Sequence, residues 1–565
     1  MTTTESWGEP DRVRRYRERV LGEREHLRTA FADPAARQRQ VLAELLEFNK
    51  DTEFGRAHGF GRISSLDEYR KAVPVHDYAA LAPLIERMAA GEHNVLSADD
   101  PVVYFTSSGT TGAHKKIPVT SAFMRTTFFP FYYAAWAPLI EHFPDVLERP
   151  DAVLNLKHDP LSLPPTTASG SPHVGASQVD FGVKFGEPLA AEPGTGAPWA
   201  TVPVPVAQND HLEKTYLRLR LAVQSDVRCV IGINPAMVAA LPYQLNLWLP
   251  RIVEEVRNGT LGGLPYGRPD PERAAELERY AERYGELRPA HVWPRLKALF
   301  CWTTGLASLY LPRLREQFGT GVTALPAPVA ASEGPVAVPL DRHGTAGSVV
   351  VTASVYEFVD ADEDLAPDVA TLGLPDLEPG RDYHVVFSHI GGLYRYAVGD
   401  VVRVVDRMEG VPRLSYAGRA NRSDAAGERL RDAQVFRALA DALDTTGLEL
   451  RNVACRVRKE AAAAPRYEFA VAPQSPWRAE EAARFADRLD AAISAEAPRY
   501  GAARSAGRLD AATVRTVDRD AFVRDWQEIV DSGVRPTQVK DRLFRQDPAH
   551  WDRLVDTPTA ERGDG

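Results

Sequence analysis

The sequence predicts an α/β protein: a large mixed N-terminal domain of helices and β-sheets, followed by a smaller α+β domain. Helical and strand-like stretches alternate through roughly the first 415 residues, and near residue 420 the pattern changes to a compact second series. At 565 residues the chain is also too long for one ordinary domain. We therefore place the large domain at 1–418 and the small domain at 425–555.

Local signals mark two helices of the large domain. In the stretch 35–48, apolar residues recur with the spacing of a helix that buries one face. The stretch 270–285 begins with Asp270, which can cap a first turn, and ends at Gly285, a residue type that often terminates helices. Strands are predicted from four β-rich runs: LKALFCW, SVVVTASVYEF, YHVVFSHI and VVRVVD.

The small domain is predicted from its own series of elements. A helix, AQVFRALADAL, is followed by two strand-like runs, NVACRVRK and RYEFAVA, a long helix near 479–495, the run TVRTVD and a further helix. Together they make roughly 140 residues, a normal domain size. Residues 556–565 are expected to form a flexible tail.

Composition excludes several classes of protein. The net charge is 67 − 77 = −10, which gives no basic footprint for nucleic acid or an anionic membrane. Cys229, Cys301 and Cys455 lie far apart, so neither a disulfide framework nor a cysteine zinc site is expected. No apolar stretch approaches the ~18 residues of a membrane helix, and no signal-peptide core is present. We expect a cytosolic protein, and the oligomeric state has no signal in the sequence.

Residues 104–120, YFTSSGTTGAHKKIPVT, combine hydroxyls, glycines and lysines directly after an apolar run. Such a composition suits a phosphate, because glycines let backbone N–H groups turn inward and lysine adds charge. A Walker A loop is excluded, since Gly109 and Gly112 stand too close together and no Gly–Lys pair follows. A plain polar turn is the alternative.

Two later segments carry carboxylates. The segment 392–403, GLYRYAVGDVVR, is predicted to end a strand and places Asp400 after Gly399. An ionised carboxylate has two acceptor oxygens, which suits a cis-diol. The segment 330–334, AASEG, places Glu333 after small residues. Taken singly, each carboxylate could belong to an ordinary turn or surface.

The three segments resemble, in the same order, the nucleotide motifs of adenylate-forming (ANL-like) enzymes. SSGTTGAHK resembles their phosphate loop, AASEG the motif whose glutamate helps to hold Mg²⁺, and YRYAVGD the motif whose aspartate binds both ribose hydroxyls. Within that superfamily the chain resembles the GH3 family of acyl acid–amido synthetases. That resemblance extends between residues 35 and 545 and is weakest at 150–215 and 420–510. It rests also on five segments: FNKDTEFGRAHGF, VPVHDYAALAPLIERMAAGEHNVLSA, WPRLKALFCWTTGLASLYLPRLREQFG, SVYEFV and SGVRPTQVKDRLF.

The resemblance implies roles for the residues that match. Six residues of the loop would bind the ATP phosphates: Ser107, Ser108, Gly109, Thr110, Thr111 and Gly112. Lys115 would be their charge partner, and Lys116 is the alternative because adjacent lysines leave the register open by one residue. Glu333 would bind Mg²⁺.

Other matching residues would bind the rest of the nucleotide or act during the reaction. Those implied for adenine and ribose are Thr304, Gly305, Leu306, Ser332, Tyr396, Asp400 and Arg419. Lys540 would contact the acid carboxylate and the α-phosphate during adenylation, and an ordinary surface lysine is the alternative. Residues 419–424 would form a hinge that moves the small domain as a lid.

The implied activity is ATP- and Mg²⁺-dependent conversion of a small carboxylic acid to an acyl-adenylate, followed by transfer to an amine. The products would be an amide, AMP and pyrophosphate. Three alternatives use some of the same motifs: an acyl-CoA ligase, an adenylation enzyme that loads a carrier protein, and a non-catalytic nucleotide-binding scaffold. A scaffold has no need of phosphate, magnesium and ribose motifs together.

Overall fold

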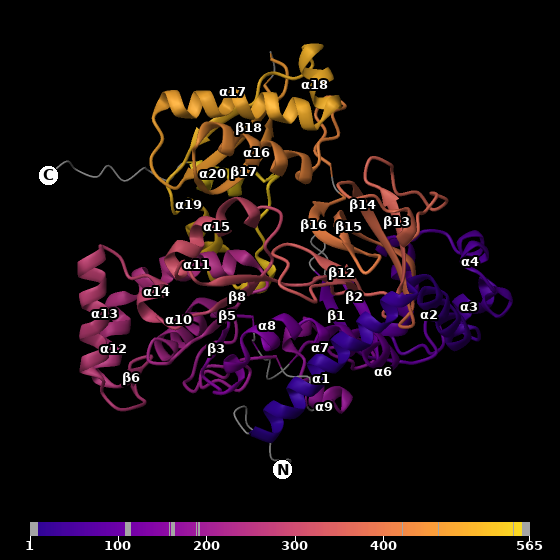
Figure 1. Ribbon diagram of the computed structural model, residues 1–565, viewed down its shortest axis with the longest axis horizontal. Coiled ribbons are helices and arrows are strands. Elements are labelled where there is room, and N and C mark those ends of the chain that lie inside the picture. Colours follow the sequence, from indigo (N-terminus) through magenta and orange to yellow (C-terminus); the bar gives the residue numbers. More distant parts are fainter. Residues whose placement is uncertain are drawn as a thin grey trace. The chain divides into compact units, whose positions relative to one another are not determined.

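The computed structural model describes residues 10–555 except 108–114, 158, 160–163, 188, 190, 191, 421, 461, 462 and 546. The chain forms two compact units, which we call the first unit (Met1–Thr201 with Ala324–Tyr416) and the second unit (Val202–Thr323 with Ala417–Gly565). Helices and β-sheets occur in both, which confirms the predicted α/β class (Figure 1). The domain limits drawn from the sequence and the hinge at 419–424 remain predictions, and the tail 556–565 lies outside the described residues.

The first unit contains both helices and strands. Its helical elements are α1 (Pro10–Thr29), η1 (Ala30–Ala32), α2 (Pro34–Asn49), α3 (Glu53–Ala57), η2 (Phe60–Arg62), α4 (Leu66–Ala72), α5 (Tyr78–Ala89), α6 (Ser121–Phe123), η3 (Met124–Phe128), α7 (Phe129–Ala134), α8 (Ala137–His142), η4 (Pro144–Leu147), η5 (Ala176–Gln178), α9 (Phe181–Phe185) and η6 (Leu374–Asp376). Its strands are β1 (Pro101–Ser107), β2 (Lys115–Thr120), β3 (Val153–Asn155), β4 (His173–Val174), β10 (Val329–Ala331), β11 (Gly334–Val338), β12 (Gly347–Val349), β13 (Val355–Asp360), β14 (Asp382–His389), β15 (Leu393–Met408) and β16 (Val411–Arg419).

The second unit also contains both helices and strands. Its helical elements are α10 (His211–Ala222), α11 (Pro235–Leu247), α12 (Leu249–Asn258), α13 (Pro271–Tyr284), α14 (Pro289–Val292), α15 (Ala307–Phe318), α16 (Asp432–Thr446), α17 (Ala479–Glu496), α18 (Pro498–Ser505), α19 (Ala521–Asp531), η7 (Pro536–Gln538) and α20 (Pro548–Val555). Its strands are β5 (Cys229–Ile231), β6 (Thr260–Leu261), β7 (Leu264–Pro265), β8 (Ala298–Cys301), β17 (Leu450–Arg458), β18 (Arg466–Pro473) and β19 (Thr513–Thr516), and β9 (Thr323–Pro326) begins at its limit.

The two helices predicted from local signals are both confirmed. α2 covers the stretch 35–48, and the side chain of Asp33 accepts a hydrogen bond from Ala36 N at its start. α13 is capped by Asp270, and it ends at Gly285, whose φ of 74° is the left-handed conformation that glycine adopts at little cost. Caps act within a few residues, which is why the sequence alone could place these helix ends.

Seven strands of the first unit form one sheet in the order β10-β11-β12-β16-β15-β14-β13. β14 lies antiparallel between β13 and β15 and is buried along its whole length, and its β-rich run YHVVFSHI includes three buried polar residues, His384, Ser388 and His389. A smaller sheet has the order β2-β1-β4, and β1 and β2 are antiparallel with Ser107 paired to Lys115. Residues 108–114 therefore connect two strands that pair directly at Ser107 and Lys115.

β15 is interrupted by two irregularities in its pairing with β14. His384 pairs with Val401 and Val386 with Ala397, so a step of two residues in β14 spans four residues in β15. The extra residues include Gly399, which has φ = 81°. A bulge of this kind bends a strand and re-aims its side chains, and bulges are common beside active sites. The expectation that the segment 392–403 ends a strand is wrong, because β15 continues to Met408.

The second irregularity is centred on Arg395. Phe387 pairs with Tyr396 and His389 with Leu393, so here a step of two residues in β14 spans three residues in β15. Arg395 adopts φ = 41°, which is uncommon for a residue with a side chain. The motif YRYAVGD is therefore a twice-bulged strand.

In the second unit, β5 and β8 form a parallel pair that is buried along its length. α11 follows β5 and α15 follows β8, so both strand-to-helix loops leave the same, carboxyl edge of the pair. In α/β folds this edge is the usual place for a ligand. The predicted segment Thr304–Leu306 lies in the second of these loops, between Cys301 and Ala307.

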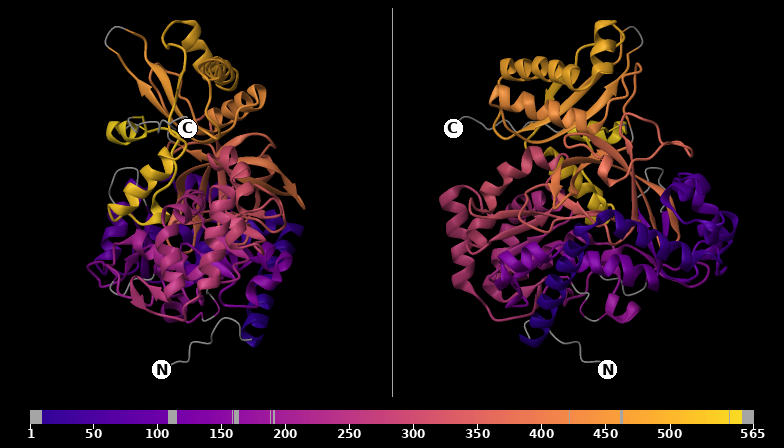
Figure 2. Two further views of the ribbon diagram at one scale, coloured as in Figure 1. Left: turned by 90° about the vertical axis from the view of Figure 1, so that its left-hand side faces the viewer. Right: turned by 45° about the vertical axis from the view of Figure 1, so that its right-hand side comes forward.

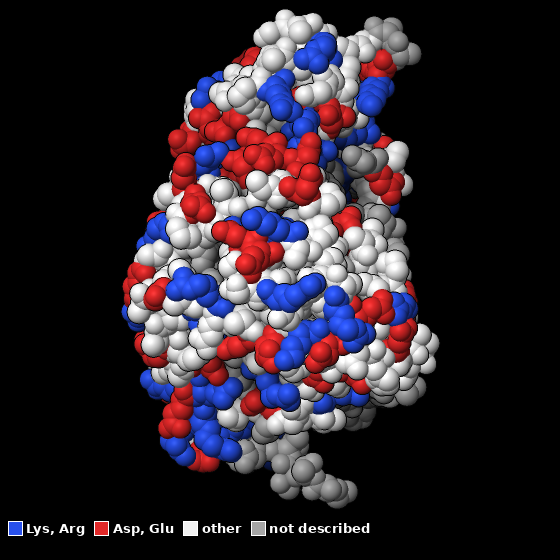
Figure 3. All heavy atoms as spheres, turned by 90° about the vertical axis from the view of Figure 1, so that its right-hand side faces the viewer, with Lys and Arg blue, Asp and Glu red and all other residues white. Residues whose placement is uncertain are grey.

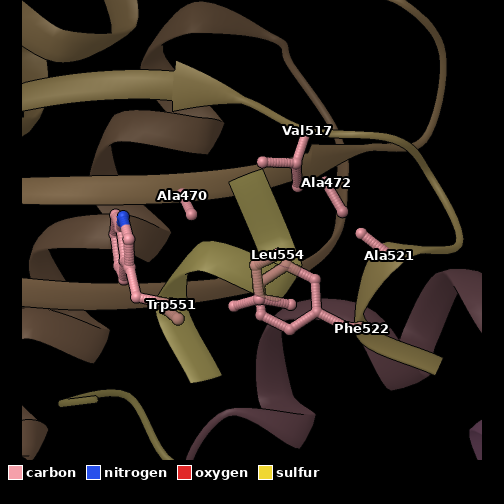
Figure 4. Packing of buried hydrophobic residues seen from close by; sticks show 8 residues of the cluster. Ala470, Ala472, Val517, Ala521, Phe522, Trp551 and Leu554 are labelled. Atoms are coloured by element: carbon pink, nitrogen blue, oxygen red, sulfur yellow. The ribbon is translucent and has the colours of Figure 1, made fainter. Parts of the chain in front are cut away.

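The C-terminal part of the second unit contains a three-stranded sheet in the order β17-β18-β19. On one face, Ala470 and Ala472 pack against Phe522 of α19 and against Trp551 and Leu554 of α20, as Figure 4 shows. Side chains alternate between the faces of a strand, so Tyr467 faces the other way, where its ring contacts a tyrosine of α18. The sheet is thus covered by helices on both faces (Figures 1 and 2). The helices and strands predicted for this region are confirmed.

On the face drawn in Figure 3, acidic and basic side chains are interspersed over most of the surface, with a group of acidic residues toward the top of the view. That face offers no continuous basic region. In the described part of the chain, no helix combines the length and the apolar character needed to cross a bilayer.

Candidate active site

Three side chains of the first unit meet at the start of β2, directly after the predicted phosphate loop. Lys115 Nζ lies 3.5 Å from Glu333 Oε1 and 3.3 Å from the hydroxyl of Tyr396, which donates to the same Oε1 at 3.2 Å. Glu333 is only 3% exposed and Tyr396 is fully buried, whereas Lys115 is partly open to solvent. Burial and the neighbouring carboxylate raise the pKa of the Tyr396 phenol, so Tyr396 stays a hydrogen-bond donor at neutral pH. We call Lys115, Glu333 and Tyr396 the charge cluster.

The two adjacent lysines have different partners. Lys116 Nζ forms an ion pair at 2.6 Å with Glu86, whose side chain is 54% exposed, and Lys116 itself is partly exposed. Lys115 Nζ lies 5.2 Å from the centre of the Tyr78 ring, whose hydroxyl accepts from the Lys116 backbone N–H at 2.8 Å. Successive residues of a strand point to opposite faces, so only one of the two lysines can reach Glu333. The geometry favours Lys115 as the functional lysine.

Glu333 is held by a tight hairpin and by a histidine that sequence analysis missed. Ser332 and Glu333 form the turn between β10 and β11, and Ser332 Oγ donates to the carbonyl of Thr106 in β1 at 3.1 Å. His389 Nε2 donates to the carbonyl of Glu333 at 2.9 Å, and its Nδ1 accepts from Gly391 N at 3.1 Å. Burial lowers the pKa of His389 to about 4, so the ring is neutral at physiological pH. No motif around His389 points to this role, which depends on contact with a residue 56 positions away.

Asp400 lies in the bulged part of β15 directly after Gly399, and it is 7% exposed. A surface-turn aspartate, the alternative to a ribose ligand, would be largely open to water. Burial at a bulge is the setting expected of a carboxylate with a specific partner.

Arg395, the other charged residue of the motif YRYAVGD, has a structural role. Its guanidinium donates to both carboxylate oxygens of Glu357, at 3.0 and 3.1 Å, and both residues are buried. It also donates to the carbonyls of Arg70 and Val73, at 3.0 and 2.8 Å. This network holds β13, β15 and the end of α4 together and supports the strained backbone at Arg395.

Other predicted residues belong to the second unit. Thr304, Gly305 and Leu306 form the loop after β8, and Gly305 has φ = 67°. Arg419 ends β16, and its backbone hydrogen-bonds the Asp432 carboxylate. Lys540 follows η7. Its ammonium lies 5.0 Å from the centre of the Trp302 ring, and Trp302 precedes Thr304 by two residues.

The structure thus brings the predicted residues together in two groups, one in each unit. Ser332, Glu333, Tyr396 and Lys115 form one group. In the other, Lys540 lies over the ring of Trp302, at the start of the loop that contains Thr304–Leu306. Ser107 ends β1 opposite Lys115. Five predicted phosphate-binding residues lie outside the described residues: Ser108, Gly109, Thr110, Thr111 and Gly112.

A separate cavity of about 760 Å³ lies in the first unit, among α1, α2 and η3. Its lining is strongly charged and includes Arg37, Arg125 and Glu44. No member of the charge cluster lines it, so this cavity is distinct from the candidate active site.

Family models match three consecutive parts of the chain. Residues 23–322 match the GH3 family N-terminal domain, 347–419 its central domain and 433–548 its C-terminal domain. The first of these matches alone covers more than half of the chain. The chain belongs to the GH3 family.

Curated relatives of this GH3 protein are plant proteins. One from Oryza sativa subsp. japonica, named "Probable indole-3-acetic acid-amido synthetase GH3.12", is 28% identical over 436 residues, or 68% of this chain and 69% of that protein. Indole-3-acetic acid-amido synthetase GH3.10 of Arabidopsis thaliana is 26% identical over 430 residues, or 67% of this chain and 70% of that protein.

Solved structures show that the GH3 fold extends over nearly the whole chain. The structure of the GH3.15 acyl acid amido synthetase superposes with a TM-score of 0.77 and covers 94% of this chain and 96% of that one at 20% identity. A complex of AtGH3.15 with 2,4-DB gives a TM-score of 0.75, with 95% of each chain covered at 19% identity. At these identities the likeness establishes the fold.

Proposed function

We propose that this GH3 protein is an ATP-dependent ligase that activates a carboxylic acid as an acyl-adenylate and transfers the acyl group to an amine. The products are an amide, AMP and pyrophosphate. The observation that carries the proposal is the charge cluster, in which an ammonium, a buried carboxylate and a phenol meet where strands β1 and β2 enter the predicted phosphate loop. The names of the curated relatives, which are amido synthetases, support the same reaction.

The first half-reaction needs stabilisation of negative charge. A carboxylate oxygen of the acid attacks the α-phosphorus of ATP, and the bond from that phosphorus to the bridging oxygen of pyrophosphate breaks. Lys115 is partly solvent-exposed and its ammonium lies 3.5 Å from Glu333, so the ammonium can exchange Glu333 for a phosphate oxygen and stabilise the departing charge. Tyr396 fixes Glu333 in place, and Asp400 on the same strand binds the ribose hydroxyls.

Mg²⁺ fits the residues present. Among the described residues, no group of three or more His, Cys, Asp and Glu side chains could hold a metal ion by itself. A magnesium ion that is bound to ATP needs fewer protein ligands. Phosphate oxygens and water fill most of its six coordination positions, and one or two carboxylates fill the rest. Glu333 would be that carboxylate, and Mg²⁺ would neutralise charge on the triphosphate.

The second half-reaction needs no nucleophile from the protein. The amine nitrogen attacks the acyl carbon of the adenylate, the bond to the phosphate oxygen breaks, and AMP leaves with that electron pair. The three cysteines of the chain are buried, and burial raises the pKa of the Cys229 thiol. None of them is in a setting that would make a reactive thiolate.

The experiment that tests the proposal is acid-dependent exchange of radiolabelled pyrophosphate into ATP over a panel of carboxylic acids, with Mg²⁺ present. Each active acid is then incubated with ATP and either a mixture of amino acids or CoA, and the products are identified by mass spectrometry. We expect exchange with at least one acid and an amide as the product. A thioester with CoA and no amide would contradict the proposal in favour of an acyl-CoA ligase, and no exchange with any acid would contradict acid activation.

A further inference from the structure

The carbonyl that precedes Lys540 is held by two buried side chains of the second unit. Asn234 Nδ2 donates to Val539 O at 2.5 Å, and Trp526 Nε1 donates to the same oxygen at 3.2 Å. Asn234 is 3% exposed and Trp526 is 6% exposed. A carbonyl oxygen has two lone pairs, and here both are used.

The residue that follows Lys540 is held as well. The hydroxyl of Tyr310, in α15, donates to the carboxylate of Asp541 at 2.7 Å, and Tyr310 is buried. The main chain is therefore fixed on both sides of Lys540, while the side chain of Lys540 itself is exposed and points over the Trp302 ring. We call Asn234, Trp526 and Tyr310 the lysine clamp.

The clamp lies at the carboxyl edge of the parallel pair β5 and β8. Asn234 is the N-cap of α11, where its Oδ1 accepts from Ala236 N at 3.1 Å, and this bond orients the amide so that Nδ2 faces Val539. The residue before it, Ile233, accepts a hydrogen bond from Trp302 N at 3.0 Å. Both loops at this edge are thus joined to each other and to the segment that carries Lys540.

We propose that Asn234 and Tyr310 are positioning residues for Lys540, holding its main chain so that the ammonium is presented beside the Thr304–Leu306 loop for adenylation. This inference rests on the proposed function. A lysine side chain has four rotatable bonds, and fixing the main chain on both sides leaves only these to be ordered when the ammonium reaches its target. Asn, Asp and Ser are all favourable N-cap residues, because each provides a side-chain oxygen that accepts a hydrogen bond. Capping alone therefore does not require the amide N–H of Asn234.

The first test measures whether the clamp holds the segment. Asn234→Ser keeps a capping oxygen for α11 but is too short to donate to Val539. Tyr310→Phe keeps the ring but removes one hydrogen bond to Asp541, whose carboxylate also hydrogen-bonds the Asn452 side chain. Asp33→Ser, at the cap of α2 in the first unit, is the matched control, because its side chain also accepts a first-turn N–H, from Ala36, and belongs to the other unit. We expect faster deuterium uptake in peptides covering 536–545 for both clamp variants and not for Asp33→Ser. Unchanged uptake would overturn the clamp whatever the activity.

The second test measures what the clamp does for the reaction. Asn234→Ser should slow pyrophosphate exchange at saturating ATP by about tenfold or more, since small displacements of a catalytic group cost this much, and leave the KM for ATP unchanged. In a Lys540→Ala background the same change should add no further loss, because there is no ammonium left to position. Multiplied losses in the double variant would show a general structural defect and overturn the inference.

The two proposals fail in different ways. If Lys540→Ala is slow but Asn234→Ser and Tyr310→Phe exchange pyrophosphate at the wild-type rate, the positioning role is wrong and the function of Lys540 stands. If Lys540→Ala itself is fully active, Lys540 has no part in adenylation and the positioning inference is overturned with it. Wild-type protein without acid-dependent exchange would overturn the proposed function, and the deuterium measurement would still decide whether the clamp exists.

Discussion

Lys115 and Lys116 are adjacent in the sequence, but their side chains lie in different environments. Pairing of β1 with β2 places Lys115 toward Glu333, which is 218 residues further along the chain, and sends Lys116 to a surface carboxylate. The sequence left this choice open, because the register between two strands depends on the partner strand and not on the lysines themselves.

This difference predicts unequal effects of two matched substitutions. Lys115→Met should lower the rate of pyrophosphate exchange by roughly 10²–10³-fold, as expected for removing one group that stabilises charge in a transition state. Lys116→Met removes only an exposed ion pair, which contributes about 0–1 kcal/mol, and exchange should stay near the wild-type rate. Steady-state exchange assays with both variants check this. A silent Lys115→Met with a damaging Lys116→Met would show that the assigned register is wrong.

Asp432 gives a prediction about stability. Burial raises the pKa of its carboxyl from the ordinary value of 3.8 to about 6, while the nearby Arg419 partly opposes this change. A raised carboxyl pKa means that the folded protein binds this proton more tightly than the unfolded chain. The associated stability is fully present below pH 3.8 and is lost as the pH rises through 6.

Asp432→Asn should therefore stabilise the protein at neutral pH, since the amide keeps an acceptor oxygen and never ionises. We expect a gain that is absent near pH 4 and reaches about 2–3 kcal/mol above pH 7, because a tenfold difference in proton affinity corresponds to ~1.36 kcal/mol. Urea unfolding between pH 4 and pH 8 measures it. Asp444→Asn, at an exposed position of the same helix, is the control. A gain that does not change with pH would show that Asp432 is not the titrating group.

At the scale of elements, the parts of the fold that depend on local signals could be predicted. α2 and α13 follow from apolar spacing, caps and a terminal glycine, β14 from the β-rich run YHVVFSHI, and the second half of β15 from VVRVVD. The bulges of β15 could not be predicted, because a bulge exists only relative to the partner strand, and nothing in GLYRYAVGDVVR fixes the pairing with β14. The same limit applies to His389, whose role depends on its contact with the β10–β11 turn.

The bulge at Gly399 predicts that two matched glycine substitutions will lower stability alike, while only one of them weakens ATP binding. Gly399 (φ = 81°) and Gly410 (φ = 85°) share a left-handed backbone, and a Cβ at either position would have no atom within 4 Å. Substitution of either glycine by alanine should lower the free energy of unfolding by about 1–2 kcal/mol, because of backbone strain alone. Only Gly399→Ala disturbs the bulge that carries Asp400, so only this variant should raise the KM for ATP, by about tenfold or more.

Thermal unfolding and ATP titration of the two variants make the comparison. Gly410→Ala is the control for the same backbone strain elsewhere in the sheet, since it lies in the turn between β15 and β16 and outside the pairing of β14 with β15. Equal KM values for ATP in both variants would show that the bulge does not orient a nucleotide ligand.

At the scale of the whole molecule, the residues predicted for the site are divided between the two units. The charge cluster belongs to the first unit, and Lys540 with the Thr304–Leu306 loop belongs to the second. The sequence could assign these residues through motifs, but it could not show the lysine clamp, because Asn234 and Val539 are 305 residues apart and Asn234 lies in none of the motifs. Placement in a reducing cytosol stays a prediction that rests on the sparse, buried cysteines.

Two half-reactions that share one adenylate allow the contribution of Lys540 to be isolated. Lys540→Ala should slow formation of the acyl-adenylate by about 10²-fold, because the ammonium stabilises charge that develops only in that step. The same variant should convert a pre-made adenylate and an amine to the amide at close to the wild-type rate, since the lysine has no charge to stabilise once pyrophosphate has left. Lys459→Ala, an exposed lysine of the same unit, controls for loss of surface charge and should leave both steps unchanged. Rapid-quench assays of each step, with one acid for all three proteins, give the comparison. Equal losses in both steps would show a folding defect in Lys540→Ala, and an unchanged first step would mean that adenylation proceeds without Lys540.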